Sequence, residues 1–268
     1  MAASLFSMMA LASLLQQPNR GLRLAVPGAT KGGMEAEEAL APLPTGLSAL
    51  DEVLPGGGLP RACVVELSAP HGLARATSIA LAACASAQAE ARCRGAAGTE
   101  GAWCAWVDAT ATLFAPAAAA ADVDLTRLLV VRPPLDAGVL ARVAVRIAQA
   151  GAFAVVVIDT TGVPGRAANE RLDRWATVVR RLSLAVEKSA TTVLLMTDAR
   201  AARPLPLPVA MRIELERRNA NQISVRVGKD RLGRVTSPSV IDIRRDAAAF
   251  GARSTSVDVA RVVRAVSA

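Results

Sequence analysis

Short apolar runs, each closed by a polar residue, recur along the middle of this 268-residue chain. Their apolar residues are continuous rather than alternating, which is typical of strands that are buried on both faces. The runs that we interpret as such strands are residues 63–67, 103–107, 128–131, 153–158 and 191–196. Because strands of this kind occur mainly in parallel sheets, the pattern predicts a mainly parallel central sheet.

Segments with a helical pattern lie between these predicted strands. Residues 75–90 are rich in alanine, and residues 136–150 and 170–188 repeat apolar residues at intervals of three and four, as one side of a helix does. Those apolar residues are Val139, Leu140, Val143 and Ile147 in the first of the two, and Leu172, Trp175, Val179, Leu182 and Val186 in the second. Strands that alternate with helices predict an α/β fold with helices on both faces of the sheet.

The pattern changes after Asp198. Residues 209–217 and 222–229 alternate apolar and polar positions around a turn at 219–221, and residues 240–243 are a candidate third strand. Alternation on both sides of a short polar turn predicts a hairpin. We therefore expect an antiparallel extension at one edge of the sheet.

Composition fits one large folded domain with short additions. Hydrophobic residues make up 52% of the chain and charged residues 20%, which excludes a disordered protein. We divide the chain into an N-terminal helix (1–20), a linker (21–42), a core (43–245) and a C-terminal tail (246–268). The N-terminal helix is apolar but carries no basic residue before Arg20, so we do not interpret it as a signal peptide and expect a cytoplasmic protein.

Charge and cysteine content bear on the partners. The formal net charge is +8, and an excess of arginine is compatible with nucleic acid or an acidic protein as partner. Aromatic residues make up only 3% of the chain, which argues against a platform that stacks bases. The cysteines, Cys63, Cys84, Cys93 and Cys104, show no metal-binding spacing, so we expect buried, reduced thiols and no metal site.

Several motifs follow one another in the order known from one family. The segment 43–51 (LPTGLSALD), then 56–60 (GGGLP) and 63–67 (CVVEL), resembles the entry into the ATPase core of RecA-type recombinases. The similarity continues over about residues 43–245 and implies a RecA-like P-loop NTPase core. Among RecA-like proteins, the small size and the additions at both ends make the chain most similar to the ImuA group, with the SulA-type division inhibitors as more distant relatives.

The resemblance places residues 69–77 (APHGLARAT) at the phosphate-binding loop. A P-loop needs glycines whose backbone N–H groups cradle phosphates, a lysine for the β- and γ-phosphates, and a hydroxyl for Mg²⁺. Here Ala69 and Ala74 replace the two glycines, Arg75 replaces the lysine, and Ala76 has no hydroxyl. A forked guanidinium does not substitute for a compact ammonium. The loop has therefore lost all four motif residues, although Gly72 and Thr77 still lie at its degenerate nucleotide site.

Other positions of the resembling active site are also changed. Asp159, at the end of a predicted strand, matches the Walker B aspartate, although an aspartate that only caps the following turn is an equal interpretation. Thr110 stands where recombinases have the glutamate that activates water, and threonine cannot act as that base. Asp198 stands where a glutamine senses the γ-phosphate, and a carboxylate there repels a triphosphate. We therefore expect no ATP hydrolysis and no nucleotide cofactor.

Basic residues are the candidates for contacts with neighbouring molecules. By resemblance, Lys229 and Arg231 match a basic pair that reaches a neighbour's nucleotide across a filament interface, and a solvated pair on an edge strand is the other interpretation. The two DNA-binding loops correspond to residues 163–170 and 201–209; both are short, and the second contains three prolines. We expect at most a weak, sequence-independent contact with DNA, and its candidate residues are four arginines, Arg166, Arg171, Arg200 and Arg203.

The two ends of the chain are candidate protein-binding segments. In RecA-like filaments an N-terminal helix docks on the adjacent protomer, and Leu11, Leu14 and Leu15 belong to a broad apolar face suited to this. Docking of that helix on its own core is the alternative. In the tail, four valines fall on one helical side and suit a segment that folds on a partner, with a frayed terminus as the alternative; they are Val259, Val262, Val263 and Val266.

Together these features predict a RecA-like accessory protein that acts by binding and not by catalysis. The resemblance to ImuA implies a role in DNA-damage-induced (SOS) translesion synthesis, with the Y-family polymerase homologue of the mutasome (ImuB-like) as partner and RecA as a second candidate. Two alternatives stay open. One is an active or weakly active DNA-dependent ATPase, and the other is a SulA-like inhibitor of cell division.

Overall fold

The computed structural model describes residues 40–70, 74–94, 102–163, 172–200 and 207–243. The chain divides into two units, Met1–Leu40 and Ala41–Ala268, and the elements below belong to the second. The predicted N-terminal helix, most of the linker and the whole tail lie outside the described residues. Among the helices that are described, none combines the length and apolar character needed to cross a lipid bilayer.

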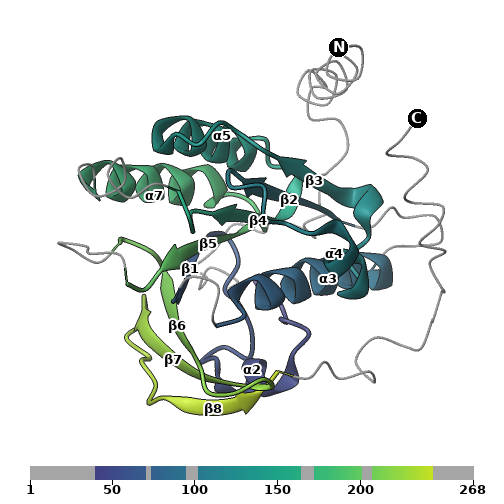
Figure 1. The fold of residues 1–268 in the computed structure, drawn as a ribbon, viewed down its shortest axis with the longest axis vertical. Coiled ribbons are helices and arrows are strands. Elements are labelled where there is room, and N and C mark those ends of the chain that lie inside the picture. The colour runs from purple at the N-terminus through teal and green to yellow at the C-terminus, as the bar shows by residue number, and fades with distance from the viewer. Residues whose placement is uncertain (1–39, 71–73, 95–101, 164–171, 201–206, 244–268) are drawn as a thin grey trace, which may run out of the picture. The chain divides into compact units, whose positions relative to one another are not determined.

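An eight-stranded mixed sheet forms the centre of this unit (Figure 1), in the order β3-β2-β4-β5-β1-β6-β7-β8. The pairs among β1 to β5, and the pair β1–β6, are parallel, whereas β6–β7 and β7–β8 are antiparallel. The strands are β1 (Cys63–Ala69), β2 (Trp103–Asp108), β3 (Leu128–Val131), β4 (Phe153–Asp159), β5 (Thr192–Asp198), β6 (Met211–Arg217), β7 (Gln222–Asp230) and β8 (Ser239–Asp242). The predicted α/β fold with a parallel centre and an antiparallel edge is confirmed.

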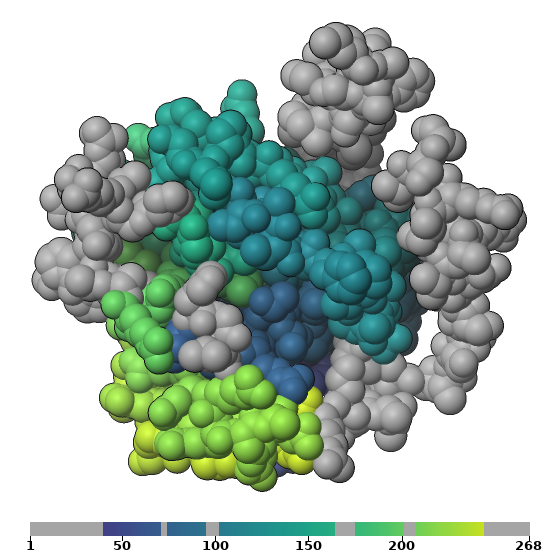
Figure 2. All heavy atoms as spheres, in the orientation of Figure 1, coloured from purple at the N-terminus to yellow at the C-terminus, as the bar shows by residue number. Residues whose placement is uncertain are grey.

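Helices cover both faces of the parallel part of the sheet (Figure 1). One apolar cluster joins α3 to the sheet, and the other joins α5 and α7 to its opposite face. The helices are α2 (Ser48–Val53), α3 (Ala76–Arg94), α4 (Ala115–Ala120), α5 (Ala137–Gln149) and α7 (Leu172–Val186), with a short 3-10 turn, η1, at Leu125–Arg127. The strands β6 to β8 form the yellow-green end of the unit in the space-filling view (Figure 2).

The parallel strands β1, β2, β4 and β5 are buried over nearly their whole length, as their continuous apolar runs predict. The prediction of burial on both faces is wrong for β3, which is only half-buried because it lies at the edge of the sheet. β1 is buried at all seven positions, and β5 at its first six. Both strands run two residues further than predicted, because the polar ends Ser68 and Thr197 still pair in register. This extension brings Ala69 and Asp198 side by side at the carboxyl end of the sheet.

The helices bury their predicted sides with one shift. In α7, Val179, Leu182 and Val186 are fully buried. In α5, the fully packed side consists of Leu140 and the alanines 141, 144 and 148, while Val139, Val143 and Ile147 are half-buried. Alanine therefore lets α5 approach the sheet closely, and the larger apolar residues fill its flank.

The expectation of four buried cysteines is wrong for one of them. Cys63, Cys84 and Cys104 are buried, but Cys93 is exposed because it lies in the last turn of α3, beyond the part of the helix that is covered. Burial raises the pKa of the Cys63 thiol to about 11. The pKa of Cys84 is also raised, first by its hydrogen bond with Cys104 and then by burial.

We therefore expect a single thiol per chain to react rapidly in the native protein. The thiolate is the reactive form, and Cys93 is the one exposed thiol of the four. Titration with a chromogenic disulfide reagent measures this, and unfolding in denaturant should release the remaining three thiols. Cys93→Ser should remove the rapid phase; a rapid phase that persists in this variant contradicts the assignment.

Candidate functional site

A cavity of about 520 Å³ opens at the carboxyl ends of the parallel strands. In open α/β sheets, ligands bind in this position, outside the carboxyl edge of the strands. Residues of β1, the start of α3, β4 and the loop after β2 form its wall. They are Ala69, Pro70, Ala74, Arg75, Ala76, Thr77, Trp106, Thr112, Leu113, Asp159, Thr161, Met196 and Arg217.

Small buried methyl groups form the corner between β1 and α3. Ala69, Ala74 and Ala76 are 5%, 1% and 8% exposed, and all three face the cavity region. Thr77, one position further on, is exposed and brings the first hydroxyl of this corner to the cavity. Gly72 lies outside the described residues, so the middle of this loop is not part of the site as described.

Arg75 directs its guanidinium to another part of the sheet. Its Nη2 donates a hydrogen bond to the carbonyl oxygen of Ala220, in the turn between β6 and β7. Arg217, another cavity residue, donates from Nε to the carbonyl of Asn219 in the same turn, at 3.1 Å. The residue at the P-loop lysine position is thus tied to a backbone carbonyl of the β6–β7 turn.

Asp159 ends β4 and lies in the cavity wall with 4% exposure. Its Oδ1 accepts hydrogen bonds from the backbone N–H of Thr161 (2.9 Å) and from its hydroxyl (2.5 Å). Thr160 is fixed separately, because its hydroxyl donates to the carbonyl of Met196 on β5 at 2.6 Å. Asp159 therefore caps the turn that follows β4, as the second of its two interpretations expected. It also lines the cavity.

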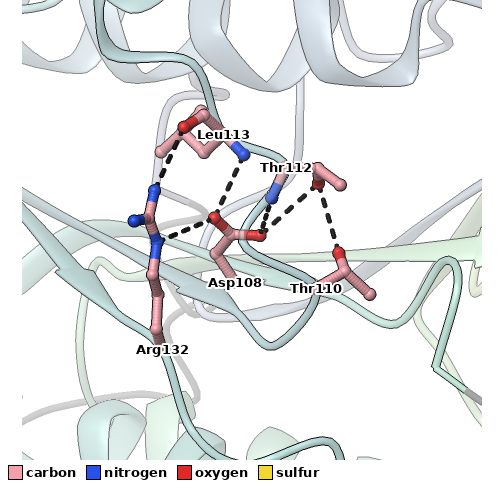
Figure 3. Close-up of polar contacts among 5 residues, drawn as sticks. All are labelled: Asp108, Thr110, Thr112, Leu113 and Arg132. Carbon is pink, nitrogen blue, oxygen red and sulfur yellow. Dashed lines mark hydrogen bonds and ion pairs between the residues drawn. The ribbon is translucent and has the colours of Figure 1, made fainter.

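A second buried carboxylate, Asp108 at the end of β2, organises the neighbouring wall (Figure 3). It accepts the backbone N–H groups of Thr112 (2.9 Å) and Leu113 (3.0 Å), and Nε of Arg132 at 3.3 Å. The Thr110 hydroxyl lies 3.2 Å from the hydroxyl of Thr112. The position that holds a glutamate in recombinases thus carries a hydroxyl engaged in the loop that Asp108 holds.

Asp198 stands at the end of β5, opposite Ala69. Its Oδ1 accepts the backbone N–H of Arg200 at 2.8 Å, and the next residue, Ala199, donates its N–H to the carbonyl of Ala69 at 2.9 Å. Asp198 is not among the residues that line the cavity. It holds the turn after β5, and the Arg200 side chain is exposed.

A buried ion pair at the centre of the sheet was not anticipated from the sequence. Glu66, fully buried in β1, accepts hydrogen bonds from the Thr197 hydroxyl (2.7 Å) and from Nε of Arg212 on β6 (2.8 Å). Arg212 is the direct cross-strand neighbour of Glu66. The one signal in the sequence is a glutamate inside an otherwise apolar strand run, since a buried carboxylate requires partners.

Lys229 and Arg231 lie at the far end of β7 from the β6–β7 turn. Lys229 donates from Nζ to the carbonyl of Leu207 at 3.0 Å, and desolvation together with nearby Arg212 lowers its pKa. Arg231 is exposed, and its backbone N–H bonds to the carbonyl of Ala210. Neither residue lines the cavity. The remaining predicted residues lie outside the described chain: Leu11, Leu14, Leu15, Arg166, Arg171, Arg203, Val259, Val262, Val263 and Val266.

The residues present do not fit a magnesium–nucleotide complex held in the P-loop manner. The hydroxyl that would bind the metal is missing at Ala76, and methyl groups occupy the corner at Ala69 and Ala74 where the motif has glycine. The guanidinium of Arg75 donates to the carbonyl of Ala220. Among the residues that the structure describes, no three His, Cys, Asp or Glu side chains gather as a metal site.

The sheet order, the helices on both faces and the cavity at the carboxyl edge define an α/β protein of the RecA type. The family described as the RecA N-terminal domain matches residues 28–201, and the chain belongs to this family.

Similar proteins include Protein RecA of Nocardia farcinica, 31% identical over 179 residues, which are 63% of this chain and 48% of that protein. Protein RecA of Cutibacterium acnes is 35% identical over 128 residues, covering 48% of this chain and 33% of that protein. Protein RecA of Mycobacterium tuberculosis is 31% identical over 179 residues, 63% of this chain and 21% of that protein. The chain thus spans about half, or less, of the length of these relatives.

Proposed function

We propose that this chain is an accessory member of the RecA family that does not hydrolyse ATP and acts by binding other proteins. One observation carries the proposal: Arg75, at the lysine position of the phosphate-binding loop, donates to the carbonyl of Ala220 and is followed by Ala76, which has no hydroxyl for a metal. Phosphoryl transfer depends on a cation and Mg²⁺ positioned on the β- and γ-phosphates. Neither requirement is met by these side chains.

The biological setting that we propose is DNA-damage-induced translesion synthesis. The support is the resemblance to the ImuA group, together with the match to the RecA N-terminal domain family and relatives named Protein RecA. The proposed partner is the Y-family polymerase homologue of the mutasome, with RecA as a second candidate. In this role the RecA-type core serves as a scaffold whose surface is recognised.

A second candidate function is a weakly active DNA-dependent ATPase. The observation that favours it is the retained cavity of about 520 Å³ with the Asp159 carboxylate in its wall. This candidate requires Arg75 to leave Ala220 and a different group to hold the metal. The experiment below separates the two functions.

Purified protein is expected to release phosphate from ATP no faster than buffer, with or without single-stranded DNA. Arg75→Lys is expected to leave this unchanged, because the metal hydroxyl at position 76 and a base at position 110 are still absent. Phosphate release is measured continuously with a coupled assay at saturating ATP and Mg²⁺.

Asp159→Ala is the matched control, since a contaminating ATPase does not respond to it. DNA-stimulated turnover that Asp159→Ala abolishes would establish the second candidate. The binding role is tested by coprecipitation from DNA-damaged cells, in which the polymerase homologue is expected with the wild-type chain. Its absence from that precipitate contradicts the proposed partner.

A further inference from the structure

Among the residues that the structure describes, most arginines outside helices α5 and α7 have a carboxylate partner. Guanidinium groups on α3, η1, the sheet and its connecting loops form ion pairs with neighbouring acids at the surface or in the interior. These paired arginines are Arg61, Arg94, Arg127, Arg132, Arg212, Arg218, Arg226 and Arg234. Their charge is balanced locally by the fold itself.

The arginines of α5 and α7 are different. Arg142 and Arg146 on α5, and Arg180 and Arg181 on α7, are exposed. No ion pair or side-chain hydrogen bond joins them to any described residue. The sequence of α5 contains no acidic residue, and neither does that of residues 175–186, the part of α7 whose side chains are described. Just beyond α7, Glu187 and Lys188 are both exposed and add one charge of each sign.

These charges belong to one surface because the two helices pack against each other. α5 and α7 lie side by side on the same face of the sheet (Figure 1) and share one apolar cluster with it. Arg142 and Arg146 are four residues apart and therefore lie on the same side of α5. We call Arg142, Arg146, Arg180, Arg181, Leu184 and Lys188 the arginine face.

An exposed leucine lies within this surface. Leu184 is 71% exposed, whereas Leu182 and Val186, its neighbours on the packed side of α7, are fully buried. Arg180 and Leu184 are four residues apart on α7, so the leucine lies beside a cation on the same side of the helix. The core does not use this leucine, and the adjacent side chains are charged.

We propose that the arginine face docks an acidic segment of a partner protein, in which an apolar side chain covers Leu184 and flanking carboxylates pair with the arginines. Charge complementarity requires an anionic partner, and a protein segment, unlike a phosphate backbone, can also cover the exposed Leu184 with an apolar side chain. A phosphodiester backbone satisfies guanidinium groups but leaves Leu184 in water. The surface is separate from the cavity, so this inference goes beyond the proposed function and does not depend on whether ATP is hydrolysed.

The test uses full-length protein and fluorescence anisotropy with three labelled probes at 0.15 M salt. The first is an acidic helical peptide with leucines on one side and glutamates flanking them. The second is the same peptide with each leucine replaced by glutamine, and the third is a 20-nucleotide single-stranded DNA. We expect the first probe to bind roughly tenfold or more tightly than the second, because only it can cover Leu184.

The variant Arg142→Glu/Arg181→Glu is expected to weaken binding of the first probe at least roughly tenfold. Leu184→Gln should reduce its affinity to that of the second probe. Arg92→Glu/Arg94→Glu, at the end of α3, changes net charge equally and is expected to bind as the wild type does. Circular dichroism confirms that each variant is folded.

Three results would overturn the proposal. Equal binding of the two peptides shows that Leu184 is not part of a docking site. Tighter binding of DNA than of either peptide, lost in Arg142→Glu/Arg181→Glu, makes the surface a nucleic-acid site. Binding of the first peptide only after Glu35, Glu37 and Glu38 are replaced by glutamine makes the chain's own acidic segment the occupant.

Discussion

Replacing Glu66 by alanine is expected to lower the free energy of unfolding by about 3–5 kcal/mol, a large part of the stability of a domain of this size. Glu66 is fully buried, and its carboxylate accepts hydrogen bonds from Thr197 and Arg212. Without it, the Arg212 guanidinium, whose side chain is 20% exposed, remains in the sheet without its counter-charge. Denaturant unfolding followed by circular dichroism gives the difference.

Glu216→Ala is the matched control because it removes a glutamate from a surface ion pair on β6. Glu216 and its partner Arg218 are 63% and 49% exposed, and we expect a loss below about 1 kcal/mol. Removing both buried charges with Glu66→Leu/Arg212→Met should recover most of the stability lost in Glu66→Ala. Equal effects of Glu66→Ala and Glu216→Ala would show that the buried pair is not strongly coupled.

The parallel centre of the fold was predictable because its strands carry continuous apolar residues. A strand buried on both faces is apolar at most of its positions, and β1, β2, β4 and β5 are buried at most of theirs. Glu66 breaks the run in β1, and sequence alone does not supply its partners. Arg212 is 146 residues away and becomes a neighbour only when β6 pairs with β1.

The short helices were not predicted. α2 and α4 have six residues each, which is less than two turns, so neither can display a helical repeat. α4 contains little besides alanine, with Pro116 in its first turn, and alanine carries no information about which side is buried. Its position is decided by packing, since Ala118 is fully buried.

The resemblance proposed the residues of the candidate site, but it did not supply their contacts, which depend on the sheet order. The contact between Arg75 and Ala220 spans 145 residues and exists because the β6–β7 turn lies beside the start of α3. The Asp159–Thr161 contact, by contrast, is local and matches a capping role that the sequence already allowed. Local polar contacts can thus be predicted from spacing, whereas contacts between segments that are far apart in the sequence cannot.

Asp108→Ala is expected to lower the free energy of unfolding by about 2–4 kcal/mol and to loosen one wall of the cavity. The Asp108 carboxylate is completely buried and accepts two backbone N–H groups, from Thr112 and Leu113, and a guanidinium N–H from Arg132. Alanine leaves the Leu113 N–H buried without an acceptor. Because Thr112 and Leu113 line the cavity, the loss reaches the site directly.

Hydrogen exchange separates this local effect from a general loss of stability. In Asp108→Ala the amides of Thr112 and Leu113 should exchange much faster, while the amides of β1 and β5 change only by the global difference. Asp136→Ala is the control, since Asp136 caps the exposed start of α5 through Val139 at 2.7 Å and costs about 1 kcal/mol. Unchanged protection at Thr112 and Leu113 in Asp108→Ala would mean that Arg132, which also donates to the carbonyl of Leu113 at 3.2 Å, holds the loop without the carboxylate.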